Sequence, residues 1–167
     1  MGFSGSFIVA RVNRPLTELA AMRVSDCTPL WWARDGRWQI LQACPVTDPD
    51  PSIIDETRAA VLVAHVVDSD FVTVQAASPD GLSWQCALSP EMARDYGLPG
   101  EWIGDPVEVG ERAEAWARGA GLQPDPLALR AALVAECDPL AEKLVFALVH
   151  ALGFRFHDGS DLEPPAE

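Results

Sequence analysis

The sequence contains no linear motif of a catalytic or cofactor site. It has no glycine-rich nucleotide loop, no HExxH, no GxSxG and no paired-cysteine zinc framework. Because catalytic groups converge in space rather than in sequence, this absence removes only the enzyme families that a linear pattern identifies. The absence of these motifs favours, without proving it, a protein that is not an enzyme, and we expect no cofactor.

Basic residues are scarce, and Lys143 is the single lysine. Twelve Lys and Arg stand against 25 Asp and Glu, which gives a formal net charge of −13 at pH 7. Such a charge opposes binding to nucleic acid and to an anionic membrane surface. It would steer a basic protein toward the chain, less strongly as salt rises. The composition therefore predicts a basic protein as partner, and it leaves the oligomeric state open.

The chain also lacks paired cysteines and long apolar runs. The four cysteines form no CxxC pair, and the longest apolar runs, such as LVFALV, are too short to span a bilayer. The first fifteen residues have neither the basic segment nor the apolar run of a signal peptide. We therefore expect a cytoplasmic protein with reduced thiols. High Ala, Arg, Asp and Pro content is typical of a GC-rich bacterial genome.

Hydrophobic periodicity divides the chain into a strand-rich part, 1–88, and a helix-rich part, 89–153. The pattern predicts an α+β fold. We expect an antiparallel sheet of five to six strands, a hairpin plus a meander, packed by a short helix at 53–60 and three to four C-terminal helices. Three of those helices are expected to begin at Asp-Pro, because Asp caps free amides and Pro fits the first turn. Residues 1–153 are predicted to form one domain, and 154–167 a poorly ordered acidic tail.

Residues 29–42, PLWWARDGRWQILQ, hold three of the six tryptophans. The central Asp-Gly dipeptide (35–36) predicts a β-hairpin with those two residues in the turn. Side chains alternate between the faces of a strand. Trp31 and Trp38 are therefore expected in the core, and Trp32 on the opposite, more polar face.

A surface hypothesis rests on Trp32, Arg34 and Arg37, which this hairpin places on one face. Arginine stacks on tryptophan by cation–π contact, and both residue types are enriched at interface hot spots. Trp102, in the Gly/Pro-rich stretch 98–106, is a second candidate. The alternative is that the C-terminal helices cover Trp32 and that Trp102 fills the core. On the surface hypothesis, the chain is an acidic protein-binding module that resembles an immunity protein or inhibitor in its chemistry.

A pocket hypothesis rests on His65, in the apolar run 60–68. A histidine on a central strand can serve as a general base. The expected pairing places His65 opposite Val74, with Gln85 on the same face and Thr73 nearby. A neutral core histidine with one hydrogen bond is the structural alternative. If these polar residues line a pocket between sheet and helices, the chain is a small-molecule-binding protein or an unrecognised enzyme.

Two further features are expected to have no functional role. Cys86 alternates with Trp84 on the face assigned to the core, so we expect a buried thiol. A compact group of possible metal ligands lies in the acidic tail, where the entropy of ordering opposes a metal site. This group consists of His157, Asp158 and Asp161.

Overall fold

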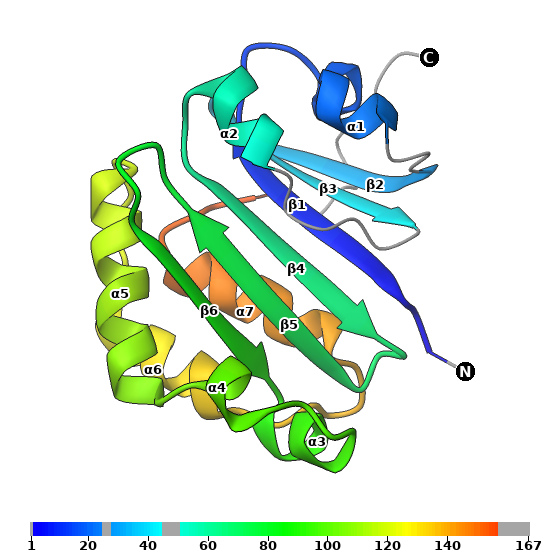
Figure 1. Cartoon of the computed structure of the whole chain (residues 1–167), viewed down its shortest axis with the longest axis vertical. Coiled ribbons are helices and arrows are strands. Elements are labelled where there is room, and N and C mark those ends of the chain that lie inside the picture. Colours follow the sequence, from blue (N-terminus) through cyan, green and yellow to red (C-terminus); the bar gives the residue numbers. More distant parts are fainter. Residues whose placement is uncertain (1, 25–27, 45–50, 157–167) are drawn as a thin grey trace.

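The computed structural model describes residues 2–24, 28–44 and 51–156 (Figure 1). These residues form an antiparallel sheet with the strand order β2-β3-β1-β4-β5-β6. The strands are β1 (Gly5–Arg11), β2 (Thr28–Asp35), β3 (Trp38–Cys44), β4 (Val61–Val67), β5 (Phe71–Ala77) and β6 (Ser83–Leu88). The predicted α+β fold, with a hairpin, a meander and C-terminal helices, is confirmed.

The helices lie in two groups. The first group connects the N-terminal strands and consists of η1 (Leu16–Glu18), α1 (Ala20–Val24) and α2 (Pro51–Thr57). The second group follows the sheet and consists of α3 (Pro90–Asp95), α4 (Gly100–Ile103), α5 (Pro106–Gly119), α6 (Pro126–Val134) and α7 (Glu142–Ala151). No helix among the described residues is long and apolar enough to cross a membrane.

Aspartate caps start two helices as predicted. The Asp105 carboxylate accepts a hydrogen bond from the Val107 N–H at 2.8 Å, and Asp125 caps α6 in the same way. The predicted Asp-Pro start of the last helix is wrong, because α7 begins at Glu142. The Ala141 N–H instead donates to the Ser69 carbonyl at 2.8 Å, a tertiary bond that anchors the preceding segment on the sheet.

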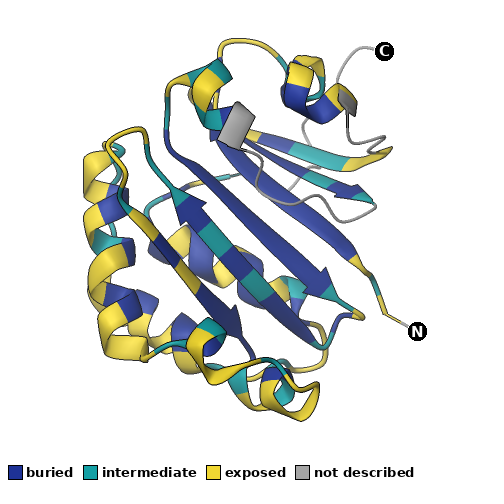
Figure 2. Cartoon of the chain, viewed as in Figure 1, coloured by how far each residue is buried: buried dark blue, intermediate teal, exposed yellow. Residues whose placement is uncertain are grey.

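Both faces of the central strands are buried (Figure 2). One face of the sheet packs against α5, α6 and α7, around residues such as Trp38 and Trp84. The other face packs against η1, α1 and α2, around residues such as Ile8 and Leu41. The first group of helices, η1, α1 and α2, does not extend over β5 and β6 (Figure 1). Gln85 of β6 is exposed on this face. Part of that face is therefore open.

The β2–β3 hairpin turns one residue later than the sequence predicted. Asp35 pairs with Trp38, so Gly36 and Arg37 form the turn. Gly36 has a φ of 58°, and a glycine at the first central position supplies the positive φ that such a turn needs. Moving the turn by one residue changes each cross-strand pair by two, which preserves the faces. Trp38 is accordingly buried as predicted, whereas Trp31 is only half-buried.

Candidate functional site

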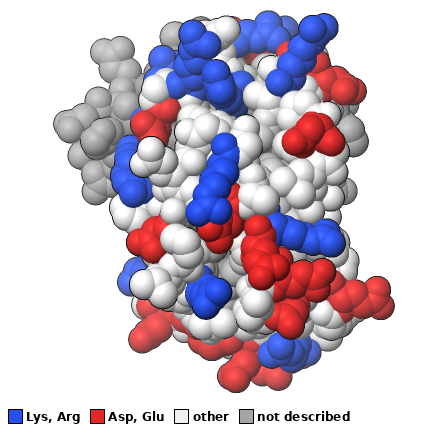
Figure 3. Space-filling model, turned by 90° about the vertical axis from the view of Figure 1, so that its left-hand side faces the viewer, with Lys and Arg blue, Asp and Glu red and all other residues white. Residues whose placement is uncertain are grey.

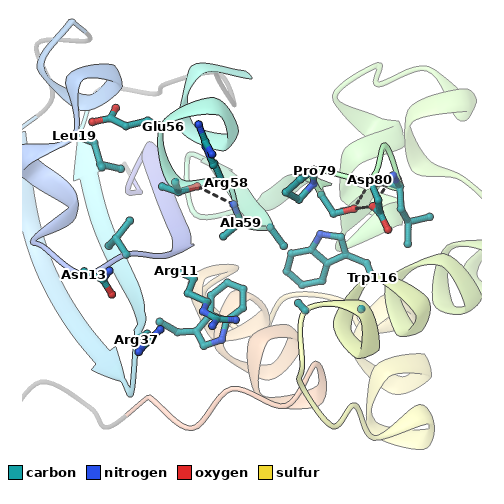
Figure 4. Close-up of a pocket in the computed structure, with 18 of the residues that line it drawn as sticks. Arg11, Asn13, Leu19, Arg37, Glu56, Arg58, Ala59, Pro79, Asp80 and Trp116 are labelled. Carbon is teal, nitrogen blue, oxygen red and sulfur yellow. Dashed lines mark hydrogen bonds between the residues drawn. The ribbon is translucent and has the colours of Figure 1, made fainter.

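Four arginines border one cavity of about 700 Å³ at the end of the sheet where β1 and β5 end and β4 and β6 begin (Figure 4). We call it the arginine pocket and define it by Arg11, Arg14, Arg37 and Arg58. A third of the 12 basic residues of this acidic chain thus surround a space of the size that a metabolite occupies.

The strand ends position two of these arginines side by side. Arg11 is the last residue of β1 and stands opposite Trp38 of β3. Arg37 precedes Trp38 in the hairpin turn, and its carbonyl accepts a hydrogen bond from the Val12 N–H at 3.0 Å. This bond fixes the turn of the hairpin to the end of the central strand. Both arginine side chains are exposed at the mouth of the cavity (Figure 4).

The other two arginines enter the pocket beside α2. Arg58 follows that helix with a φ of 52°, in the left-handed region that costs a residue with a side chain roughly 1–2 kcal/mol. Arg14 forms an ion pair with Glu56. Among the described residues, the guanidinium groups of Arg11, Arg37 and Arg58 form no ion pair. Three of the four guanidinium groups at the pocket are therefore without an ion pair to any carboxylate that the structure describes.

The floor of the pocket is apolar. It is formed by the indole rings of Trp38 and Trp116, whose centroids are 6.5 Å apart, together with Leu82 and Ala60. Trp116 donates its Nε1–H to the carbonyl of Ala77 at 3.0 Å, so its polar atom is already used within the protein. A ligand would meet hydrocarbon and aromatic surface below the charged rim.

The wall of the pocket across from the arginines comes from the β5–β6 turn and the end of α5. Asp80 accepts hydrogen bonds at Oδ1 from the Ser78 hydroxyl and, at 3.3 Å, from the Leu82 N–H. These hydrogen bonds, with that of Ser78 the largest, hold the pKa of Asp80 below its usual value, and the carboxylate is charged at neutral pH. Gly119 and Ala120 complete this wall.

A second cavity of about 700 Å³ lies between the open part of the sheet and the α4–α5 segment. Glu101, Asp105 and Glu108 line it from the helical side, together with Arg112, which forms an ion pair with Glu108. Gln75 and Gln85 line it from the sheet. We call it the acidic groove. Figure 3 shows basic side chains gathered mainly toward the end of the molecule with α1 and α2, and acidic side chains toward the end with α3 and α4. The two cavities therefore differ in the sign of their surroundings.

Trp32 is neither fully exposed nor covered by the C-terminal helices, the two alternatives that the sequence left open. Trp32 is half-buried against the η1, α1 and α2 side of the sheet, and the expected cover by C-terminal helices is wrong. Its Nε1–H donates to the Gln39 Oε1 at 2.9 Å. The Arg34 guanidinium lies 5.2 Å from the centroid of the Trp32 ring, within the range of a cation–π contact.

The predicted surface residues do not form one site. Arg37 belongs to the arginine pocket, whereas Trp32, Arg34 and Trp102 line neither large cavity. Trp102 is half-buried in the single turn of α4. A binding role for Trp32, Arg34 and Trp102 stays a prediction.

The predicted pocket residues share a sheet face but no large cavity. His65 stands opposite Thr73, and the predicted pairing with Val74 is wrong. The β4–β5 turn uses one residue more than expected, because the strand already ends at Val67. His65 is buried, with its Nδ1 3.2 Å from the Ser6 hydroxyl. Of the three predicted residues, Gln85 lines the acidic groove, and His65 and Thr73 line neither cavity.

Cys86 is a buried thiol, as expected. It lies in the core beneath α5 and α6, and burial raises its pKa to about 12. A thiol with so high a pKa is a poor nucleophile at neutral pH. The described part of the chain has no group of three or more His, Cys, Asp or Glu residues that could hold a metal ion. The cluster of His157, Asp158 and Asp161 lies outside the described residues.

Sequence reasoning missed Arg11, Arg14 and Arg58 as site residues. The usable signal was their position at the ends of a predicted strand and a predicted helix, but nothing in the sequence shows which ends meet. Gln39 was also missed as a structural residue. It is fully buried, and it accepts from the Leu16 N–H at 3.0 Å in addition to Trp32.

Comparisons with protein-family models, curated proteins and solved structures find no match for this chain. The function is therefore inferred from the geometry of the molecule itself.

Proposed function

We propose that this chain is a binding protein for a small anionic ligand and that the arginine pocket is its binding site. The observation that carries the proposal is that Arg11, Arg37 and Arg58 line one cavity and form no ion pair with a described carboxylate. Guanidinium groups bind carboxylates and phosphates through paired, charge-assisted hydrogen bonds. An anion in the pocket would supply the missing partners.

Electrostatics and backbone strain both support this site. Arg11, Arg37 and Arg58 place three positive charges around one cavity, and the low dielectric of its apolar floor strengthens the field that they create. Such a cluster is stabilised when an anion binds. Arg58 adds a left-handed backbone conformation at the rim, and conformations of this kind concentrate at functional sites.

The direct test is calorimetric titration of the purified chain with phosphate, pyrophosphate and glutarate, at low and at high salt. We expect at least one of these anions to bind, less tightly as salt rises. Arg11→Gln and Arg37→Gln should each weaken binding by about tenfold, the loss expected for a charge-assisted hydrogen bond.

Arg34→Gln is the matched control, because it removes the same charge from the same hairpin without touching the pocket. Its affinity for the anions should stay within about twofold of the parent protein, since surface charges at a distance are largely screened. Failure of all three anions to bind, or an equal loss in Arg34→Gln, would reject the proposal.

Docking of a basic protein is the second candidate function. The acidic groove favours it, since a concave surface there combines Glu101, Asp105 and Glu108 with the side-chain amides of an uncovered sheet face. A chain with a net charge of −13 attracts cationic proteins at long range. In this mode Gln85 and the carboxylates of the groove would contact the partner.

A further inference from the structure

We infer that the ligand of the arginine pocket is a small zwitterion with net negative charge, whose anionic groups face the arginines and whose ammonium group faces Asp80. This inference rests on the proposed function and adds the chemical class of the ligand. It follows from the unequal charge of the two walls of the cavity.

The positive wall carries more charge than the negative wall. Arg11, Arg37 and Arg58 contribute three guanidinium groups that form no ion pair with a described residue, and Asp80 contributes one carboxylate. Glu56 also lines the pocket, but its charge is paired with Arg14. Figure 4 shows Arg11 and Arg37 on one side of the Trp116 indole and Asp80 on another. A ligand that satisfies both walls needs two anionic groups or one doubly charged group, together with one cationic group.

The Asp80 carboxylate is positioned to accept a hydrogen bond from a ligand. The Ser78 hydroxyl and the Leu82 N–H both bind its Oδ1, which fixes the carboxylate and keeps its pKa low. Asp80 is exposed and forms no ion pair with a described residue. The turn therefore presents a charged, oriented carboxylate to the cavity.

The end of α5 reinforces the negative wall. This helix has 14 residues, and its last residue, Gly119, and the adjoining Ala120 line the pocket. The C-terminus of a helix carries a partial negative charge that stabilises nearby cations. The basic residue of its last turn, Arg118, is already paired with Glu114. An ammonium group near Asp80 would thus gain from two negative sources.

The experiment compares matched ligands that differ by one ammonium group. The first pair is glutamate and glutarate, and the second is phosphoserine and 3-phosphooxypropionate, which tests phosphate in place of a second carboxylate. Each ligand is titrated into the parent protein and into Asp80→Asn. The asparagine oxygen can still accept from Ser78 and Leu82, so the turn is preserved.

We expect the ammonium-bearing member of at least one pair to bind the parent protein about five- to tenfold more tightly, the strength of one surface charge pair in partial screening. Asp80→Asn should abolish that preference, because it should act differently on the two ligands. It should weaken the zwitterion and leave the simple anion unchanged or tighter, because a repulsive carboxylate is removed.

Three results overturn the inference while the proposed function stands. The first is equal or tighter binding of the simple anion in both pairs. The second is an equal loss for both members in Asp80→Asn, and the third is binding of phosphate or pyrophosphate without binding of either pair. If phosphate, pyrophosphate and both pairs all fail to bind, the proposed function falls together with the inference.

Discussion

Val12 donates its backbone N–H to the carbonyl oxygen of Arg37 at 3.0 Å, which joins the end of β1 to the turn between β2 and β3. The turn is therefore anchored on the central strand, and Arg37 is held beside Arg11 at the mouth of the arginine pocket. Hydrogen-bonded geometry of the backbone, rather than side-chain packing, sets the position of two of the proposed ligand-binding groups.

Gly36→Ala tests this role of the turn. Gly36 has a φ of 58°, and a methyl group added there would meet no atom within 4 Å, so the substitution strains only the backbone. We expect the free energy of unfolding to fall by about 1–2 kcal/mol, and anion affinity to fall as Arg37 shifts. Urea denaturation and calorimetry measure the two effects. Gly100→Ala, equally uncrowded but without a positive φ, should cause no loss of stability or of affinity. A similar loss there would refute the role of φ.

Arg58→Gly should move stability and binding in opposite directions. Glycine adopts the left-handed conformation at φ 52° without the penalty of a side chain, so unfolding should cost about 1 kcal/mol more. Loss of the guanidinium should weaken anion binding by about tenfold. Arg58→Ala should lose the same binding with no gain in stability. If either Arg58 variant keeps its anion affinity, or if its weaker binding is explained by unfolding alone, Arg58 is not part of the binding site.

Gln39→Met should be strongly destabilising. The Gln39 amide accepts from Leu16 N–H and Trp32 Nε1–H and donates to the Arg14 carbonyl at 2.9 Å, so three partners lose their hydrogen bond. At about 1 kcal/mol or more for each buried group, we expect a loss of about 3 kcal/mol in urea denaturation. Trp32→Phe removes one of the three bonds and should cost less. Equal costs would show that packing, not hydrogen bonding, dominates.

Because the thiol of Cys86 is buried, we expect the free energy of unfolding to fall at alkaline pH. Burial raises its pKa from 9.0 to about 12 in the folded state, so the folded protein keeps the proton while the unfolded chain releases it. The contribution is complete below pH 9 and is lost as pH rises toward 12, by about 1 kcal/mol for the first unit above 9. Urea denaturation at pH 8 and pH 10 should show a smaller fall for Cys86→Ala. Parallel curves for the two proteins would contradict the shift.

Docking on the acidic groove is tested by comparing two variants that lose the same number of carboxylates, one inside the groove and one outside it. The triple variant Glu101→Gln, Asp105→Asn and Glu108→Gln should lose salt-sensitive binding to a synthetic lysine-rich peptide, measured by fluorescence anisotropy. A matched triple variant, Glu91→Gln, Asp95→Asn and Glu111→Gln, removes equal charge outside the groove. It should retain most of the affinity, because screened surface charges act over about 10 Å. Equal losses in the two variants would indicate attraction by net charge alone.

Individual strands and helix starts could be predicted from the sequence because each depends on residues only a few positions apart. The run 60–68 predicted a strand buried on both faces, and β4 is that strand. Asp-Pro predicted the starts of α5 and α6, since a capping carboxylate and a fixed φ act within one turn. The alternation of Trp31 and Trp38 predicted their common face even with the turn misplaced, because side-chain direction depends only on position along each strand.

The sequence by itself determined the two periodicities, and with them the α+β class, the core faces of the strands and the excess of negative charge. Tertiary structure alone decided which strand ends meet. The arginine pocket combines residues from β1, the β2–β3 turn, the α2–β4 connection and the β5–β6 turn, which are far apart in the chain. Their convergence follows from β1 pairing between β3 and β4, a long-range choice made by burial on both faces of the sheet rather than by any local signal.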